Sequence, residues 1–458
     1  MNTKEALTII DRVLPNQHLS HIQELVFCQS WEGKTYQEIA DIAGYDHDYV
    51  KEIGSSLWHS LSTSLAERVT KKNFQSVLRR YEERSKLDRK GSNLDRISSE
   101  PQTSVAQVEV SPKVTARRED WGEAPDVSLF YGRTDELTLL EQWIIQDRCR
   151  LVALLGMGGI GKTALSVTLA EEIQGGFKHT IWRSMRNPKP AIETVATLID
   201  LLSDHHKTSI PETLDASISL LIKYLQKHRC LIVLDGAEEI LRSGDYAGTY
   251  LNGYEDYGQI LRRIGESQHQ SCVILTSREQ PREFTLLDGS RVRSHYLRGL
   301  SSGEGKEIFA ERGDFYGDEA DWERLISYYA GNPSAIKIVV CAVQEFFDRD
   351  ISRLVDLLNQ DGLVFEDIKE LLDQHFDRLS EAEKELMHWL AINRMLPLLP
   401  EMSSEMLSEI SLVRSPQELL TIVNSLRRRS LIVKTSTGYS QQLMISEYIK
   451  SRSIAENS

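Results

Sequence analysis

The sequence is poor in the features that mark secreted, zinc-binding and membrane-spanning proteins. Its 458 residues include only 5 cysteines, which stand singly, without the CxxC spacing of a zinc site or the density of a disulfide framework. No apolar run approaches the roughly 20 residues that span a bilayer, and Asp11 and Arg12 interrupt the short apolar stretch near the start. We therefore expect a cytoplasmic protein with reduced cysteines and no membrane association.

Basic residues are also fewer than acidic residues. The chain has 54 Lys and Arg against 68 Asp and Glu, a net charge of −14. This balance argues against a nucleic-acid surface over the whole chain, although a local basic patch stays compatible with it. The length exceeds what one hydrophobic core usually supports, so two to four domains are expected. The sequence holds no internal repeat or heptad array that would predict a solenoid or coiled coil.

Five patterns follow one another along the chain. Residues 1–90 show helical periodicity and predict a small all-α domain. Residues 91–127 are rich in Ser, Pro, Gln and charge and predict a linker of low order. Short apolar runs alternate with helical segments over residues 128–300. A helical domain over 301–360 and a winged-helix domain over 361–458 are then expected.

Short β-rich runs define the central region. Near-continuous apolar strands are buried on both faces, which predicts a parallel sheet covered by helices. The runs are RLVALLG (150–156), HTIWRSM (179–185), CLIVLDG (230–236), SCVILTSR (271–278) and SHYLRGL (294–300). A further pair of strands, near the C-terminus, is predicted to form a hairpin that turns at Thr437 and Gly438.

The first of these runs leads directly into GMGGIGKT at 156–163, and a helical segment, ALSVTLAEEI, follows. This is the GxxxxGK[ST] loop between a strand and a helix, in which glycines let backbone N–H groups approach a phosphate at the positive end of a helix. The predicted cradle positions are Gly156, Gly158, Gly159, Ile160 and Gly161. The expected fold class is therefore a multidomain protein with an α/β P-loop NTPase core.

Two side chains and one backbone amide at the start of that helix carry the expected chemistry. Lys162 should reach the β- and γ-phosphate oxygens, the Thr163 hydroxyl should ligate Mg²⁺, and the Ala164 amide should meet the α-phosphate. A glycine turn that binds nothing is the alternative, and the full motif in its context disfavours it. A second Gly-Lys-Thr at 33–35 follows no strand and is not a phosphate loop.

A second candidate group of polar residues ends the strand LIVLD. Asp235 stands where a carboxylate can hold Mg²⁺ beside the P-loop. Glu238 and Glu239 follow after two small residues, so either can act as general base toward an attacking water. The alternative reading makes both the acidic first turn of a helix, which the helix dipole favours.

With these motifs in hand, the chain resembles the STAND class of P-loop ATPases and, within it, the NB-ARC family. Phe130-Tyr131-Gly132-Arg133, completed by Glu136, resembles the segment that cradles adenine in this family. IWRS at 181–184 is similar to the segment of its second strand. The resemblance covers about residues 126–450, and the ordered occurrence of several motifs makes it more specific than any single one.

Two further segments extend the resemblance toward the C-terminus. LTSR at 275–278 is similar to the sensor strand, whose arginine, here Arg278, faces the γ-phosphate in the family. GNPSA at 331–335 resembles the helical-domain motif whose proline, here Pro333, packs on the nucleotide. The family's Met-His-Asp segment aligns with Ile445-Ser446-Glu447, where no histidine is present. The resemblance then implies that the C-terminal domain is weakly held by ADP. The alternative is that Ser446 lies in a hairpin or helix cap remote from the nucleotide.

The resemblance implies a Mg²⁺-dependent ATP/ADP switch that hydrolyses ATP slowly, in signalling or defence. Bound ADP would keep the nucleotide, helical and winged-helix domains closed, and ATP would open them and permit self-assembly. The chain looks most like cyanobacterial proteins that join an N-terminal helix-turn-helix-like domain to NB-ARC and β-propeller repeats. This sequence stops after the winged helix, so either a protein partner supplies the sensor or the sensor lies outside this sequence.

The N-terminal region has a helix-turn-helix pattern. Thr35 to Glu38 form a capping box before a helix with Ile39, Ala40 and Ile42 on its apolar side, and a turn at Gly44 precedes a longer helix. The start of that second helix is acidic, DHDYVKE at 46–52, where a DNA reader carries basic or amide side chains. Protein or effector recruitment is therefore favoured over DNA binding.

Two rival functions remain beside the switch. A transcription regulator of the same ATPase class would use the N-terminal domain to bind DNA. A constitutive NTPase or helicase-like motor is disfavoured because no further helicase motifs follow the P-loop.

Overall fold

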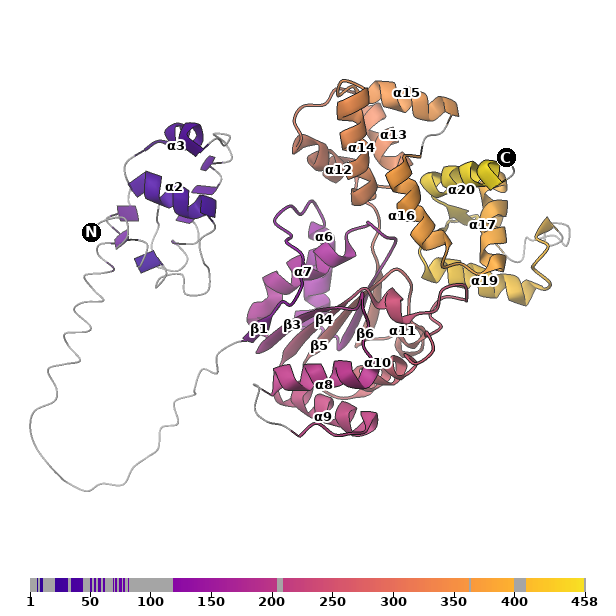
Figure 1. The fold of residues 1–458 in the computed structure, drawn as a ribbon, viewed down its shortest axis with the longest axis horizontal. Helices are drawn as coiled ribbons and strands as arrows, with labels where there is room; N and C mark the ends of the chain where they lie inside the picture. The colour runs from indigo at the N-terminus through magenta and orange to yellow at the C-terminus, as the bar shows by residue number, and fades with distance from the viewer. Residues whose placement is uncertain are drawn as a thin grey trace, which may run out of the picture. The chain divides into compact units, whose positions relative to one another are not determined.

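The protein was analysed as a computed structural model, which divides into two compact units, Met1–Ser111 and Pro112–Ser458 (Figure 1). In the first unit the structure describes residues 21–31 and 34–43 and single positions between 6 and 81. In the second it describes residues 118–203, 209–361, 364–398 and 409–456. Within these described parts, no helix is long and apolar enough to cross a membrane.

The N-terminal unit contains α2 (His21–Trp31) and α3 (Tyr36–Ala43). The predicted capping box begins α3, because the Thr35 N–H donates to Glu38 Oε2 at 2.7 Å and the Glu38 N–H donates to Thr35 Oγ1 at 3.3 Å. Phe27, Trp58 and Phe74 pack in its core, with ring centroids 4.6 to 6.5 Å apart. The acidic stretch at 46–49 that bears on DNA binding lies outside the described residues.

The large unit begins with a six-stranded parallel sheet of order β1-β3-β4-β5-β2-β6. Its strands are β1 (Arg118–Asp120), β2 (Leu151–Leu155), β3 (His179–Ser184), β4 (Cys230–Asp235), β5 (Cys272–Ser277) and β6 (Val292–Tyr296). Its helices are α6 (Thr134–Glu141), α7 (Lys162–Ile173), α8 (Ala191–Leu202), α9 (Leu214–Lys227), α10 (Asp256–Glu266) and α11 (Arg282–Leu287). Shorter helical segments are the π-helix η1 (Gln142–Gln146) and the 3₁₀ helices η2 (Gln174–Gly176) and η3 (Ala237–Ile240).

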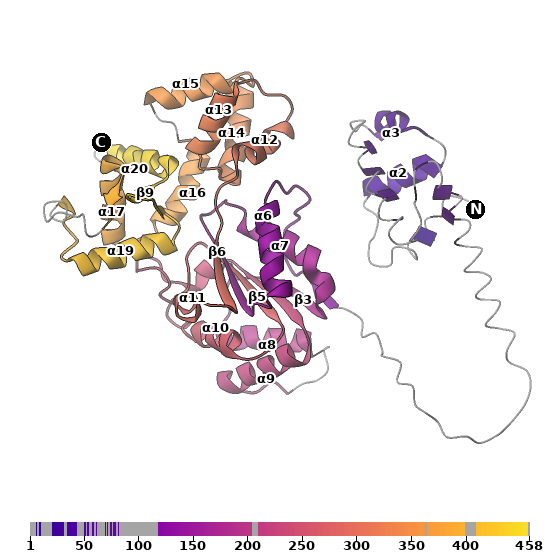
Figure 2. The ribbon, with the colours of Figure 1, turned by 180° about the vertical axis from the view of Figure 1, so that it is seen from behind.

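Alternation along the strands explains why both faces of this sheet are covered. In β2, Leu151, Ala153 and Leu155 join the core formed with α8, α9 and α10. Val152 and Leu154 point to the other face and join the core formed with α6 and α7. The two helical layers lie on opposite sides of the sheet in Figures 1 and 2. The predicted parallel sheet covered by helices is confirmed.

Two details of the predicted central region differ in the structure. The edge strand β1 lies inside the range assigned to the linker and pairs with β3, with Arg118 beside His179. Three charged residues carry no apolar pattern, so the edge strand had no sequence signal. The last strand begins at Val292, two residues before the predicted run, and ends at Tyr296.

The C-terminal half is mainly helical. Its helices are α12 (Ser302–Ala310), α13 (Glu319–Tyr328), α14 (Pro333–Phe346), α15 (Ile351–Asp361), α16 (Glu366–Phe376), α17 (Glu381–Asn393), α19 (Pro416–Arg428) and α20 (Leu443–Glu456). A small antiparallel sheet of order β7-β9-β8 joins them, with β7 (Leu396–Pro397), β8 (Ile432–Lys434) and β9 (Gly438–Gln441). The predicted hairpin is therefore present as β8 and β9.

One hydrophobic core runs through these C-terminal elements. It includes Leu325 of α13, Val339 of α14, Leu372 of α16 and Leu386 of α17, all nearly inaccessible to solvent. Met157, which belongs to the P-loop of the first half, is part of the same core. The C-terminal helices therefore pack directly on the nucleotide-binding loop.

Candidate nucleotide-binding site

The P-loop joins the central strand β2 to α7. Gly161 is the N-cap of α7 with φ 99°, and Gly159 has φ 76°, a left-handed conformation that favours glycine. A Cβ on Gly159 would lie 2.7 Å from the Cβ of Ser334, so the loop also needs glycine for the close approach of α14. The strand-glycine-helix context that the sequence predicted is present.

Lys162 lies inside this loop with 8% of its surface exposed. Its Nζ donates to the carbonyl oxygens of Gly156 at 2.9 Å and Met157 at 2.8 Å. Burial lowers the pKa of Lys162 to about 8, and the nearby Glu238 carboxylate opposes that shift. A buried ammonium with only carbonyl partners favours an anion, and phosphate oxygens can supply that charge.

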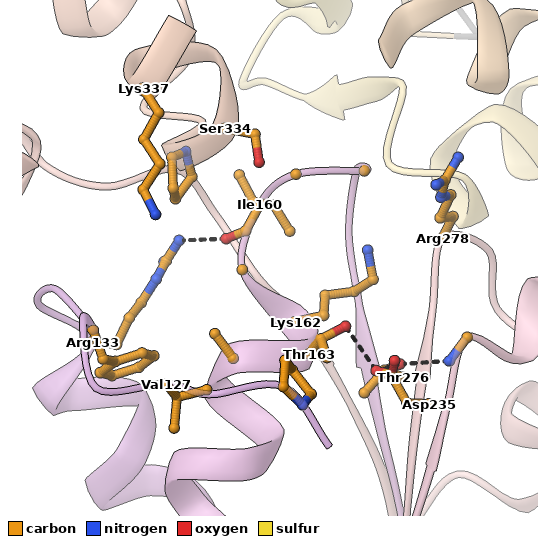
Figure 3. Close-up of a pocket in the computed structure, with 18 of the residues that line it drawn as sticks. Val127, Arg133, Ile160, Lys162, Thr163, Asp235, Thr276, Arg278, Ser334 and Lys337 are labelled. Carbon is orange, nitrogen blue, oxygen red and sulfur yellow. Dashed lines mark hydrogen bonds between the residues drawn. The ribbon is translucent and has the colours of Figure 1, made fainter. Parts of the chain in front are cut away.

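The two predicted Mg²⁺ ligands are already in contact. Thr163 Oγ1 donates to Asp235 Oδ1 at 2.8 Å, and Thr276 Oγ1 donates to the same oxygen at 2.7 Å (Figure 3). Burial raises the pKa of Asp235, while the two hydroxyls act in the opposite direction. A hydroxyl and a carboxylate fit Mg²⁺, which is usually held by few protein ligands together with phosphates and water.

A protein-only metal cluster is not present in the described part of the chain, because no three His, Cys, Asp or Glu side chains are grouped to hold an ion.

Glu238 and Glu239 differ in their surroundings. Both come from η3, but the Glu238 side chain is buried and that of Glu239 is exposed. Glu238 Oε1 lies 3.0 Å from Arg278 Nε, and the Arg278 backbone N–H donates to Glu238 Oε2 at 3.2 Å. The predicted base and the predicted sensor arginine are therefore paired with each other.

The predicted adenine-side segment is fixed by Arg133. Arg133 has φ 65° and is almost fully buried. Its guanidinium donates to Glu136 Oε1 at 2.9 Å and to the Ile160 carbonyl oxygen at 3.0 Å. Its backbone N–H donates to Glu304 Oε1 at 2.9 Å, which ties this segment to α12. The segment thus connects the P-loop with the C-terminal half.

These residues surround one cavity of about 740 Å³, a size in the range of small-molecule and cofactor sites. All of the predicted site residues line it except Gly156, which bonds to Lys162. The lining members are Phe130, Tyr131, Arg133, Gly158, Gly159, Ile160, Gly161, Lys162, Thr163, Ala164, Asp235, Glu238, Glu239, Arg278 and Pro333.

Several lining residues were missed by the sequence analysis. These are Pro125, Asp126, Val127 and Leu129 on the adenine side and Arg186, Lys337 and Gln374 from three other elements. Figure 3 shows Lys337 and Arg133 extending toward the same part of the cavity. Lys337 and Gln374 lie on helices far from the P-loop in sequence, and only the tertiary structure brings them to it.

The C-terminal helices contact the P-loop backbone directly. Asn332, the N-cap of α14, donates from Nδ2 to the Gly158 carbonyl oxygen at 2.9 Å, and the Ser334 N–H donates to the Gly159 carbonyl oxygen at 3.3 Å. His375 of α16 accepts the Gly158 N–H at Nε2 over 2.5 Å.

Of the two placements considered for Ser446, the one beside the nucleotide is wrong and the one remote from it agrees with the structure. Ser446 lies in α20, where its Oγ donates to the Ala391 carbonyl oxygen of α17 at 3.4 Å, and it does not line the cavity. A histidine nevertheless reaches the P-loop, but it is His375. Its sequence signal is a polar residue within the apolar stripe of Ile368, Leu372 and Leu379 in and after α16.

Comparison with known families agrees with this geometry. Residues 133–281 match the NB-ARC domain family, and residues 1–81 match the family described as the vWA-MoxR associated protein N-terminal HTH. An uncharacterized WD repeat-containing protein of Nostoc sp. is 47% identical over 347 residues, which are 74% of this chain and 27% of that protein. The chain therefore spans about a quarter of the length of this relative.

Solved structures were also compared. A Walker-type ATPase of Pyrococcus abyssi has a TM-score of 0.47 at 14% identity, covering 70% of this chain and 96% of its own. A STAND protein with a tetratricopeptide repeat sensor from Pyrococcus horikoshii has a TM-score of 0.37 at 18% identity, covering 73% and 44%. The family assignment rests on the two family matches and on the P-loop site: the chain contains an NB-ARC domain at residues 133–281, which holds the P-loop, and a helix-turn-helix domain at residues 1–81.

Proposed function

We propose that this protein is an ATP/ADP-controlled switch that hydrolyses Mg-ATP slowly. Bound ADP keeps the C-terminal helices closed on the P-loop, and exchange for ATP releases them and permits self-assembly. A protein sensor or effector supplies the trigger or receives the signal, in a cytoplasmic signalling or defence response.

The main observation behind this proposal is that the C-terminal helices contact the P-loop itself. Asn332 donates to the Gly158 carbonyl oxygen, His375 accepts the Gly158 N–H, and Met157 lies in the C-terminal core. A loop that is held in this way cannot reorganise around a nucleotide without affecting α14 and α16. This supports a device in which the phosphates bias a two-state arrangement of packed elements.

The state of Glu238 supports slow hydrolysis. A general base needs a free oxygen within hydrogen-bond reach of the attacking water. In this structure both Glu238 oxygens face Arg278, and the Glu238 side chain is only 10% exposed, so solvent screens the pair little. Hydrolysis then requires Arg278 to move away from Glu238 first.

The other site residues would each contact a different part of the Mg-nucleotide. Lys162 would exchange its two carbonyl partners for phosphate oxygens, and Thr163 and Asp235 would hold the cation. Mg²⁺, when bound, neutralises charge on the β- and γ-phosphates. Arg133 keeps the adenine-side segment fixed to Ile160, and Pro333 closes the cavity from the start of α14.

Nucleotide binding, turnover and assembly test this proposal on the full chain. Calorimetry should show binding of both Mg-ADP and a non-hydrolysable Mg-ATP analogue. Steady-state turnover should stay below the ~1 s⁻¹ that marks the slow end of ordinary enzymes. Mass photometry should show larger species with the ATP analogue than with ADP. Fast turnover with no difference in mass between the nucleotides would contradict the switch and favour a constitutive NTPase.

A DNA-bound regulator of the same ATPase class is the second candidate, and the helix-turn-helix match over residues 1–81 favours it. Fluorescence anisotropy of the full chain with a mixed-sequence DNA duplex tests it. Binding that weakens steeply between about 50 and 200 mM salt would support DNA contacts. No binding at the lower salt concentration would leave protein recruitment as the role of this domain.

A further inference from the structure

The His375 imidazole accepts a hydrogen bond from a backbone N–H of the P-loop. Its Nε2 accepts the Gly158 N–H at 2.5 Å, and the side chain is almost fully buried. An Nε2 that accepts a proton donor must carry a lone pair, so the ring is neutral with its proton on Nδ1. Burial, with Arg278 and Lys162 nearby, lowers the pKa of His375 well below its usual value, which agrees with a neutral ring.

The position of Gly158 in the cavity connects this hydrogen bond with phosphate binding. Gly158 lines the cavity, and a Cβ built on it would lie 2.8 Å from His375 Nε2 and 3.5 Å from Arg278 Cζ. The glycine thus stands between the α16 histidine and the arginine at the end of the sensor strand. Backbone N–H groups of a P-loop are donors to phosphate oxygens. The imidazole therefore takes a donor at the arginine end of the cavity.

Gln374, which precedes His375 in α16, likewise accepts a hydrogen bond, from the Arg278 guanidinium. Gln374 Oε1 accepts from Arg278 Nη2 at 3.0 Å and lines the cavity. Two consecutive residues thus place two uncharged acceptor atoms on two donors, a backbone N–H and a guanidinium. A terminal phosphate presents acceptor oxygens of the same kind, with more charge and greater strength.

We propose that Gln374 and His375 stand in for the oxygens of the γ-phosphate, and that α16 is the element that discriminates ATP from ADP. This rests on the proposed function in taking both nucleotides as ligands. With ADP, the two side chains satisfy the Gly158 N–H and Arg278. With ATP, the γ-phosphate competes for the same donors and displaces α16.

Displacement of α16 has a direct route to the C-terminal end. Asp373, the residue before Gln374, accepts from Arg452 Nη1 at 2.9 Å and from the Tyr448 hydroxyl, both in α20. The rings of Phe376 and Tyr448 are 5.9 Å apart. On the other side, Arg378 donates to the Glu238 carbonyl oxygen at 2.8 Å. Movement of α16 therefore changes the contacts of both α20 and the base segment.

Affinity ratios of two α16 variants test the inference. Calorimetry on the full chain would measure Kd for Mg-ADP and for a non-hydrolysable Mg-ATP analogue. His375→Leu keeps a side chain of similar bulk without an acceptor, and Gln374→Ala removes the acceptor from Arg278. When the γ-phosphate is absent, His375→Leu leaves the buried Gly158 N–H without its acceptor and should shift the affinity ratio toward ATP by about tenfold. Gln374→Ala removes a more exposed acceptor from Arg278, so it should shift the ratio in the same direction by a smaller factor.

Matched variants separate this role from a structural one. Glu370→Ala alters an exposed residue of the same helix and should leave the ratio unchanged. His375→Gln restores an acceptor and should recover part of the ADP preference, which a loss of packing alone would not allow. If His375→Leu fails to fold, Gln374→Ala still provides the test, because Gln374 is exposed.

The outcomes distinguish this inference from the proposed function. If the parent protein binds both nucleotides, and the ratio is unchanged in His375→Leu and Gln374→Ala, the surrogate role is wrong while the nucleotide site stands. If the parent binds neither nucleotide, the proposed function fails as well. A shift toward ATP in both variants, about tenfold in His375→Leu, that is absent in Glu370→Ala supports α16 as the discriminating element.

Discussion

Arg278 holds Glu238 at two points, through Nε at 3.0 Å from Oε1 and through its backbone N–H at 3.2 Å from Oε2. The sensor arginine and the candidate base therefore neutralise each other when no phosphate lies between them. A γ-phosphate that attracts Arg278 would release Glu238 in the same step. In the proposed switch, nucleotide sensing and the start of hydrolysis would then be coupled through this ion pair.

Lys162→Ala should abolish measurable binding of both nucleotides. The loop would keep its backbone N–H groups but would lose the mobile cation that reaches the β- and γ-oxygens. Calorimetry with Mg-ADP and Mg-ATP checks this, with Lys227→Ala, an exposed lysine at the end of α9, as the control. Unchanged affinity in Lys162→Ala would contradict the assignment of the phosphate loop.

Glu238→Gln should slow hydrolysis by about 100-fold and leave the affinity for ATP nearly unchanged, because a base acts only in the chemical step. Glu239→Gln is the matched control, since Glu239 is exposed at the next position. Single-turnover kinetics measure both. If Glu239→Gln carries the loss, Glu239 is the base, and hydrolysis that survives in the double variant excludes both.

Arg278→Ala should weaken ATP by about tenfold or more and ADP much less, because only ATP offers a γ-phosphate to the guanidinium. Calorimetry measures the two affinities, with Arg263→Ala as a control that breaks a peripheral pair with Asp215. Equal losses for ATP and ADP would show that Arg278 acts on another part of the nucleotide.

A buried ion-pair network joins the sensor segment to the C-terminal helices. Glu279 follows Arg278 directly, and its Oε2 lies 2.8 Å from Arg429 Nη1, while Arg429 Nε lies 3.3 Å from Glu383 Oε1. Glu279, Glu383 and Arg429 are almost fully buried. The network therefore fixes the C-terminal helices to the segment that follows β5.

Arg429→Met should lower the free energy of unfolding by about 3 kcal/mol, because it leaves the buried Glu383 carboxylate without its cation and leaves Glu279 with Arg378 alone. Arg353→Met is the control, since Arg353 is 60% exposed and pairs at the surface, where a change within about 0.5 kcal/mol is expected. Chemical denaturation of the full chain measures both. Equal losses in the free energy of unfolding would show that the buried network stabilises the fold no more than an exposed ion pair does.

The sequence predicted the parts of the site that depend on local pattern. The P-loop, Asp235, Glu238 and Arg278 each follow a strand with an apolar signal, and parallel strands bring their carboxyl ends to one edge. The cavity joins these residues as expected from that rule. The edge strand β1 had no such signal because its three residues are all charged.

The contacts between α16 and the P-loop could not be predicted in the same way. His375 is 217 positions from Gly158, and no period in the sequence reports a contact of that range. The resemblance points to Ser446, which instead lies in α20 and packs against α17. The element that reaches the loop is set by the packing of the C-terminal core, which one sequence does not encode in any local motif.

Hydrogen exchange of the amides in α16, measured on the full chain with Mg-ADP and with a non-hydrolysable Mg-ATP analogue, tests the switch most directly. Amides of residues 366–376 should be protected with ADP, where α16 holds the P-loop, and should exchange faster with the ATP analogue, where the γ-phosphate displaces it. Equal protection of α16 with the two nucleotides, under conditions in which both are bound, would contradict the account.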